Sequence, residues 1–289
     1  MGPIKIGDIV GRKSYNCDIY FKVVDISLRP DGRDWAYIKG LDLRLCADAP
    51  VEDLKKIDKS QISNYLRESM KKNAEHMRRI FMRRSKEREL MLKRAAGTAI
   101  DSFDVPGSVL HLDGDKEYLD LCLTSYKQLS VPVKGVHVKE SEQARALATL
   151  LPEHNPDILV LTGHDGLVNK HKIDFSDINA YRNSGHFVDS VKVARKYEKS
   201  KDDLVIFAGA CQSHYEAILA AGANFASSPQ RVLIHAFDPV FVVEKISFTS
   251  IYSPISIKDV IENTITGFDG IGGLETRGKY RMGIPRSPY

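Results

Sequence analysis

A chain of 289 residues, with 43% hydrophobic and 28% charged residues, has the ordinary composition of a globular protein and is long enough for two domains. No apolar run approaches 18 residues and the first residues lack the apolar segment of a secretion signal, so we expect neither a membrane-spanning helix nor export by a signal peptide. The four cysteines are scattered without a CxxC spacing, which indicates neither a zinc site nor a disulfide framework and favours a reducing compartment.

Residues 1–51 predict a small β module. Three short β-rich runs, IKIGDIVGRKS, DIYFKVVDISL and DWAYIKGLDLRLCA, are separated by turn signals, most clearly RPDGRD at residues 29–34. The opening IGDIVGRKS followed by paired strands resembles an SH3-like β-barrel. Such barrels bind peptides or nucleic acid or simply dock domains, and these roles stay open here.

Residues 52–97 predict a long basic helix that links two domains. No Pro or Gly interrupts the helical part, and a partial apolar stripe runs along it. Residues 61–97 hold 11 Lys or Arg against 4 Asp or Glu, a net charge of +7, while the whole chain carries only +4. Such a run forms either a solvated helix face or a binding surface for an acidic partner or nucleic acid.

Residues 98–289 alternate between strand-like and helix-like segments. The predicted strands are GSVLHLDGD, VPVKGVHV, PDILVLTGHDG, DLVIFAGAC and RVLIHAF, and helical patterns separate them. Continuous apolar strands that alternate with helices predict an α/β domain with a mostly parallel sheet and helices on both faces.

Two of these predicted strands end in reactive side chains, His164 after DILVLTG and Cys211 after DLVIFAGA. Functional groups of parallel sheets gather beyond the carboxyl ends of the strands, so the two side chains meet if their strands are neighbours. A nearby base and a helix N-terminus both turn a cysteine into a nucleophile. The backbone N–H groups of Cys211 and Gly166 are then the natural donors to an oxyanion.

Simpler interpretations stay open for each of these residues. A cysteine after an apolar run is often a small core residue, and a histidine at a strand end is often structural. His214, one turn after Cys211, is a second candidate for the base. Asp165 is a candidate for orienting His164, and without it the site is a dyad with no third member.

The order strand–GHDG, helix, strand–GAC resembles the caspase-like cysteine peptidases, a group that includes caspases, clostripain, legumain and separase. Over nearly its whole length the sequence resembles the YabG family of sporulation-specific cysteine peptidases, through IGDIVGRKSY, the basic helix, LVLTGHDG and FAGACQSHYEAI. This resemblance implies a caspase-like domain in which His164 is general base and acid and Cys211 is the nucleophile, with no metal or organic cofactor. Caspases place Gln and Gly where this chain has Gly209 and Ser213, so their aspartate-directed pocket is not implied.

The resemblance also implies which substrates are cut. It implies cleavage after basic residues in spore coat and cortex-related proteins, either in the mother-cell cytoplasm or at the spore coat. An S1 pocket for arginine needs a carboxylate, and the candidates are Asp113, Asp115 and Asp238. With arginine at P1, the segment Arg78–Arg94 predicts self-cleavage between the two domains.

A non-catalytic function is the alternative. The SH3-like module and the basic helix of a spore-structural protein would hold nucleic acid or an acidic coat protein. Salt-dependent binding by residues 1–97 and indifference to thiol alkylation would distinguish this alternative from a peptidase.

Overall fold

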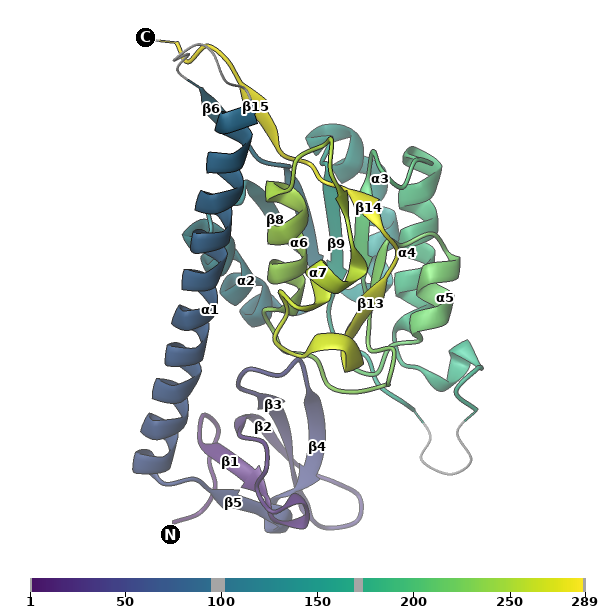
Figure 1. The fold of residues 1–289 in the computed structure, drawn as a ribbon. Helices are drawn as coiled ribbons and strands as arrows, with labels where there is room; N and C mark the ends of the chain where they lie inside the picture. The colour runs from purple at the N-terminus through teal and green to yellow at the C-terminus, as the bar shows by residue number, and fades with distance from the viewer. Residues whose placement is uncertain (1, 95–101, 169–173, 288–289) are drawn as a thin grey trace. The chain divides into compact units, whose positions relative to one another are not determined.

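A computed structural model describes residues 2–94, 102–168 and 174–287, the side chains of 91–94 excepted (Figure 1). The chain divides into two compact units. The N-terminal unit comprises Met1–Leu41 and Leu45–Ala99, and the C-terminal unit comprises Asp42–Arg44 and Ile100–Tyr289. The predicted boundary between linker and peptidase domain, at residues 97 and 98, lies outside the described residues.

The described residues of the N-terminal unit form a five-stranded antiparallel sheet and one long helix. The sheet has the order β4-β3-β2-β1-β5, and its strands are β1 (Ile9–Arg12), β2 (Phe21–Leu28), β3 (Asp34–Gly40), β4 (Cys46–Pro50) and β5 (Leu54–Lys56). Short apolar side chains such as Val10, Val23 and Ile38 fill its core. The β module is confirmed, while its classification as an SH3-like barrel stays a prediction.

The long helix α1 spans Lys59–Arg94 and is shorter at its start than the sequence pattern predicts. Residues Leu54–Lys56 continue the sheet instead, because they pair with β1. No helix in the described part of the chain combines the length and the apolar character that crossing a membrane requires.

The C-terminal unit is built on a six-stranded mixed sheet, mostly parallel as predicted. Side by side, its strands are β13 (Ile271–Gly273), β11 (Phe225–Ser227), β10 (Val205–Ala208), β9 (Ile158–Thr162), β7 (Val109–Asp113) and β8 (Val133–His137). Only β13 runs antiparallel to its neighbour in this sheet. The classification of this unit as caspase-like stays a prediction.

Helices cover this sheet in two layers (Figure 1). One layer contains α3 (Glu140–His154), α4 (Ser184–Tyr197) and α5 (Tyr215–Ala220), and the other contains α2 (Lys116–Gln128) and α6 (Asp238–Phe248). The remaining elements are α7 (Ile257–Ile261), two small ribbons in which β6 (Phe103–Val105) pairs with β15 (Arg281–Gly283) and β12 (Pro254–Ile255) pairs with β14 (Thr276–Arg277), and the 3-10 turns Lys13–Tyr15, Val51–Asp53, Ile178–Ala180 and Gly267–Asp269.

The predicted strand RVLIHAF, residues 231–237, is wrong. The strand beside β10 is β11, which the sequence pattern did not indicate. Residues 231–237 form a partly buried loop, with a single β-bridge at His235, in which Ile234 and Ala236 are almost inaccessible to solvent. A short apolar run reports burial and not strand pairing, and here burial beneath other parts of the unit accounts for the pattern.

Because side chains alternate along a strand, the two faces of the sheet differ. Leu110 and Leu112 point into an apolar core that they share with Leu159, Leu161 and residues of α3 and α4. The intervening His111 and Asp113 are also fully buried but lie on the α2 side, within a polar network. The candidate site lies at the end of this polar network, where Asp113 contacts Asp115 and Asp115 contacts His164.

Candidate active site

His164 and Cys211 follow neighbouring parallel strands at matching positions. In the pairing of β9 with β10, Ile158 lies opposite Val205 and Leu161 lies opposite Ala208. The N–H of Gly209 donates to Leu161 O at 3.0 Å and extends the ladder beyond the strand. His164 and Cys211 each lie three residues beyond the last paired residues of these strands, Leu161 and Ala208. The expectation that their strands are neighbours is therefore confirmed.

Asp165 ties together the loops that carry these two residues. Its Oδ2 accepts hydrogen bonds from Ser213 Oγ at 2.9 Å and from Ser184 Oγ at 2.5 Å. Ser213 Oγ in turn accepts the N–H of Ala210, directly before the cysteine, at 2.9 Å. Burial raises the pKa of the Asp165 carboxyl group, against these hydrogen bonds. Asp165 thus connects the two loops, and its carboxylate is committed to that role.

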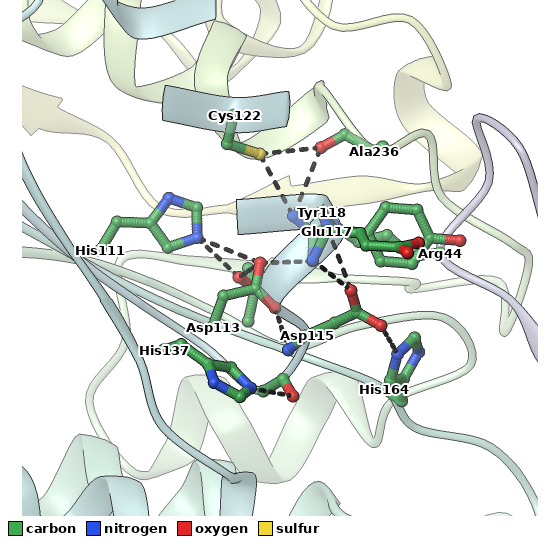
Figure 2. A network of polar contacts seen from close by, with 12 residues as sticks. Arg44, His111, Asp113, Asp115, Glu117, Tyr118, Cys122, His137, His164 and Ala236 are labelled. Carbon is green, nitrogen blue, oxygen red and sulfur yellow. Dashed lines mark hydrogen bonds and ion pairs between the residues drawn. The ribbon is translucent and has the colours of Figure 1, made fainter. Parts of the chain in front are cut away.

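The imidazole of His164 is held by Asp115 instead (Figure 2). His164 Nε2 lies 2.7 Å from Asp115 Oδ2, and the imidazole is partly exposed, at 20%. The ring of Tyr118 meets it edge-on with centroids 5.7 Å apart. The His164 backbone is fixed as well, because its N–H donates to Glu140 Oε1 at 2.6 Å. An ordered carboxylate–imidazole pair is the arrangement that sets the tautomer and the direction of a catalytic histidine.

Asp115 is itself rigidly placed. Its Oδ1 caps α2 by accepting the N–H groups of Glu117 and Tyr118 at 2.9 and 3.1 Å. Its own N–H donates to Asp113 Oδ1 at 2.9 Å. The residue follows β7, which is the neighbour of β9 on the side away from β10. Between β7 and β9 the crossover connections diverge to opposite sides, which is where open α/β sheets hold their ligands.

Cys211 is closed off from solvent in this structure, with an exposed fraction of 1%. Its Sγ accepts the N–H of Ile234 at 3.2 Å, and Ile234 belongs to the partly buried loop 231–237. The next residue, Gln212, has a φ of +56°, so the chain turns sharply after the cysteine. The sulfur is therefore shielded from solvent, with the backbone of Ile234 packed against it.

All three acids predicted for S1 have internal partners, and two of them are fully buried. Asp113 is fully buried, and its Oδ2 lies 2.8 Å from Arg44 Nη1. Burial raises the pKa of Asp113, but the Arg44 guanidinium outweighs it and holds that pKa far below its usual range. Asp238 is fully buried too and accepts the N–H groups of His235 and Ile265 at 3.0 and 2.7 Å. Neither carboxylate is open to an arginine of a substrate, and Asp115 is engaged by His164.

The predicted oxyanion donor Gly166 and the alternative base His214 are both engaged in other contacts. The N–H of Gly166 donates to Asp165 Oδ1 at 2.9 Å, which turns this predicted oxyanion donor toward its own loop. The alternative base His214 places Nε2 3.1 Å from Ser176 O and Nδ1 3.2 Å from Glu216 Oε2. With both ring nitrogens of His214 engaged, His164 is the better candidate for the base.

Glu140 is a part of the site that the sequence pattern did not reveal. A Cβ atom at Gly114 or Gly163 would lie 2.2 or 2.1 Å from Glu140 Oε1, so the two glycines leave room for this carboxylate. Glu140 begins α3 and is distant in sequence from both. The capping role of Asp115 was detectable, because an acid just before a helical pattern is an N-cap signal.

Inside the C-terminal unit, the described His, Cys, Asp and Glu side chains form no group of three close enough to share a metal ion.

Comparisons with known proteins agree with one another. A profile of the family described as YabG peptidase U57 matches residues 5–285. A relative from Bacillus subtilis (strain 168), the sporulation-specific protease YabG, is 44% identical over 284 residues, which cover 97% of this chain and 98% of the relative. No solved structure matches the chain.

Proposed function

The chain belongs to the YabG peptidase family U57, and on this premise we propose that it is a cysteine endopeptidase of sporulating cells, with Cys211 as nucleophile and His164 as general base and acid. One observation carries the proposal. The two residues each lie three positions beyond the last residue pair of the neighbouring strands β9 and β10, and Asp165 joins their loops.

The contacts of His164 suggest how the proton moves. Because Asp115 engages Nε2, Nδ1 is the nitrogen that exchanges a proton with the thiol. His164 takes the Cys211 proton, and the thiolate attacks the scissile carbonyl carbon. The N–H of Cys211 stabilises the oxyanion, and His164 then protonates the leaving amine. Water, deprotonated by His164, releases the acyl group and restores the thiol.

The contact between Cys211 and Ile234 belongs to a closed state of this site. Catalytic hydrogen bonds are often long or misaligned before substrate binds, and they tighten in the complex. A bound peptide would displace the N–H of Ile234 from the sulfur and free the thiol for His164. Movement of the loop 231–237 is therefore part of the proposed cycle.

The substrates proposed are spore coat and cortex-related proteins, cut after arginine or lysine. The relative is named a sporulation-specific protease, which supports sporulation as the setting. Asp113 and Asp238 are engaged inside the protein, so the proposed specificity does not place either of them in S1. A set of peptides that differ only at P1, with Arg, Lys, Gln or Asp, tests the specificity. Equal cleavage of the Arg and Gln peptides would contradict it.

Self-cleavage within Arg78–Arg94 is part of the same proposal. This segment lies in α1, and Arg78, Arg79 and Arg88 are among its basic residues. Mass spectrometry of stored wild-type protein and of the Cys211→Ala variant tests it. Fragments ending in arginine should form only in the wild-type protein, and identical patterns would remove self-cleavage from the proposal.

Replacement of the nucleophile tests the proposed function itself. We expect Cys211→Ala to abolish cleavage of an arginine-containing peptide while circular dichroism stays like that of the wild type. Cys17→Ala, in the N-terminal unit, is the matched control and should cleave normally. Cleavage at the wild-type rate by Cys211→Ala would refute the assignment. If that variant does not fold, alkylation of the wild-type protein with iodoacetamide decides, with and without protection by substrate.

A further inference from the structure

Arg44 is a buried cation that belongs to the C-terminal unit although it lies between β3 and β4 in the sequence. Its side chain has an exposed fraction of 0%. Nη1 pairs with Asp113 Oδ2 at 2.8 Å, and Nη2 lies 3.3 Å from Cys122 Sγ and 3.5 Å from Ala236 O. The guanidinium thus has a fixed position and direction.

Asp113 connects Arg44 to Asp115 through its two carboxylate oxygens. While Oδ2 contacts Arg44 and accepts the hydroxyl of Thr162 at 2.8 Å, Oδ1 accepts the N–H of Asp115 at 2.9 Å. The other end of Asp115 engages His164 Nε2 at 2.7 Å. Figure 2 shows the resulting series of contacts, which runs from Arg44 through Asp113 and Asp115 to His164.

The backbone of Arg44 is connected to Cys211 through Ile234. Its N–H donates to Ile234 O at 3.1 Å, and the N–H of Ile234 donates to Cys211 Sγ at 3.2 Å. The neighbouring Leu43 forms a β-bridge with His235. Arg44 is therefore connected to His164 by its side chain and to Cys211 by its main chain.

Stability alone is a poor explanation for this buried pair. Taking two charges out of water costs free energy that their attraction often only balances, and apolar replacements of similar volume are frequently neutral or stabilising. A guanidinium differs from apolar groups in offering directed donors in one plane, which fix the orientation of a carboxylate.

We propose that Arg44 is a positioning residue of the peptidase site, which through Asp113 and Asp115 holds the imidazole of His164 in its working orientation. This inference rests on the proposed function. It also makes the tripeptide Asp42–Arg44 a necessary part of the catalytic unit, although it precedes the rest of that unit by more than fifty residues.

Kinetics of Arg44→Met test the inference. We expect kcat to fall about 10- to 100-fold, the range found when a hydrogen-bonding partner behind a functional histidine is lost, with KM little changed. Arg44→Lys restores the charge but not the fork of donors, so we expect partial rescue. The double variant Arg44→Met/Asp113→Leu removes both buried charges, and we expect it to fold and still to show the low kcat.

Arg195→Met is the matched control for a structural role. Arg195 is half-buried, and it donates to Gly222 O and Leu204 O at 2.8 Å each. Leu204 lies at the amino end of β10, whereas Cys211 follows its carboxyl end, so Arg195 contacts the opposite end of the strand. Its loss should lower the thermal midpoint without lowering kcat per folded molecule.

A spectroscopic reading separates orientation from general damage. In the Cys211→Ala background, NMR should show a downfield Nε2–H resonance of His164 that Arg44→Met abolishes and Arg195→Met retains. Wild-type kcat in the folded double variant, or an unchanged resonance in Arg44→Met, would overturn the role of Arg44. Cleavage by Cys211→Ala would instead overturn the proposed function, so the two failures are distinguishable.

Discussion

The two faces of the C-terminal sheet differ in what their buried residues do. On the α3 and α4 side, Leu110 and Leu112 pack among aliphatic and aromatic side chains. On the α2 side, His111 and Asp113, from the same strand, lie in a network of ions and hydrogen bonds that ends at His164. We infer that burial has two uses here: the apolar face stabilises the fold, and the polar face holds the imidazole of His164 in its orientation.

Burying the polar face also costs more free energy than burying the apolar face. Arg44, His111, Asp113 and Cys122 are all fully buried, and each loses hydration on folding. Burial lowers the pKa of His111 and raises that of Cys122 to about 12, so both are neutral near pH 7. Only the pair Arg44 and Asp113 remains charged, and its two charges cancel.

Asp115→Asn should have the largest effect on activity, because Asp115 contacts the imidazole of His164. Asparagine caps a helix as well as aspartate does, so the stability of α2 should be kept. Activity should fall by about 10²- to 10⁴-fold, as when an amide replaces the carboxylate behind a catalytic histidine. The measurement is kcat/KM together with thermal unfolding. Normal activity in this variant would show that the polar face does not orient His164.

Leu159→Ala probes the apolar face. Leu159 is fully buried, and removing its side chain should lower the free energy of unfolding by about 2–5 kcal/mol. Unfolding in urea measures that loss, while kcat per folded molecule should stay at the wild-type value. A drop in kcat as large as that of Asp115→Asn would erase the distinction between the faces.

The loop connection at Asp165 should show a smaller effect. Asp165→Asn places an amide NH2 where one carboxylate oxygen was, so it disturbs either the bonds from the N–H groups of Gly166 and Asn183 at Oδ1 or the two serine hydroxyl bonds at Oδ2. We expect a loss of about 1–3 kcal/mol in the free energy of unfolding, the cost of leaving a buried polar group poorly satisfied. Equilibrium unfolding measures it, and no loss at all would show that the two loops need no such connection.

The smallest expected effect is a difference in acid sensitivity. The folded-state pKa of Asp113 is depressed, so its contribution to stability is present above the unfolded value of about 3.9 and is lost as pH falls below it. Between pH 5 and pH 2 the wild type should therefore lose more stability than Arg44→Met/Asp113→Leu. Parallel curves of unfolding free energy against pH would contradict this assignment.

The sequence predicted those parts of the fold that depend on local patterns. The alternation of strands and helices was correct, and so was the location of His164 and Cys211 at the ends of neighbouring strands. The loop 231–237 was mistaken for a strand because its apolar residues are buried for another reason.

Contacts between distant residues lay beyond the sequence pattern. Arg44 and Asp113 are 69 positions apart, and no local sequence pattern around either residue indicates that they form an ion pair. For this reason Asp113 was expected in a substrate pocket, and the link from Asp115 to His164 was missed. The sequence alone does not distinguish an acidic residue that is open to a ligand from one that pairs with a distant residue in the folded protein.

Covalent labelling of Cys211 is the most direct test of its proposed role as nucleophile. The wild-type protein is treated with a peptidyl arginyl chloromethyl ketone, and adducts are mapped by mass spectrometry while residual cleavage is followed. We predict one adduct, on Cys211, that accumulates in step with the loss of activity and fails to form in His164→Ala. Loss of activity with Cys211 unmodified, or full activity with Cys211 labelled, would contradict the account.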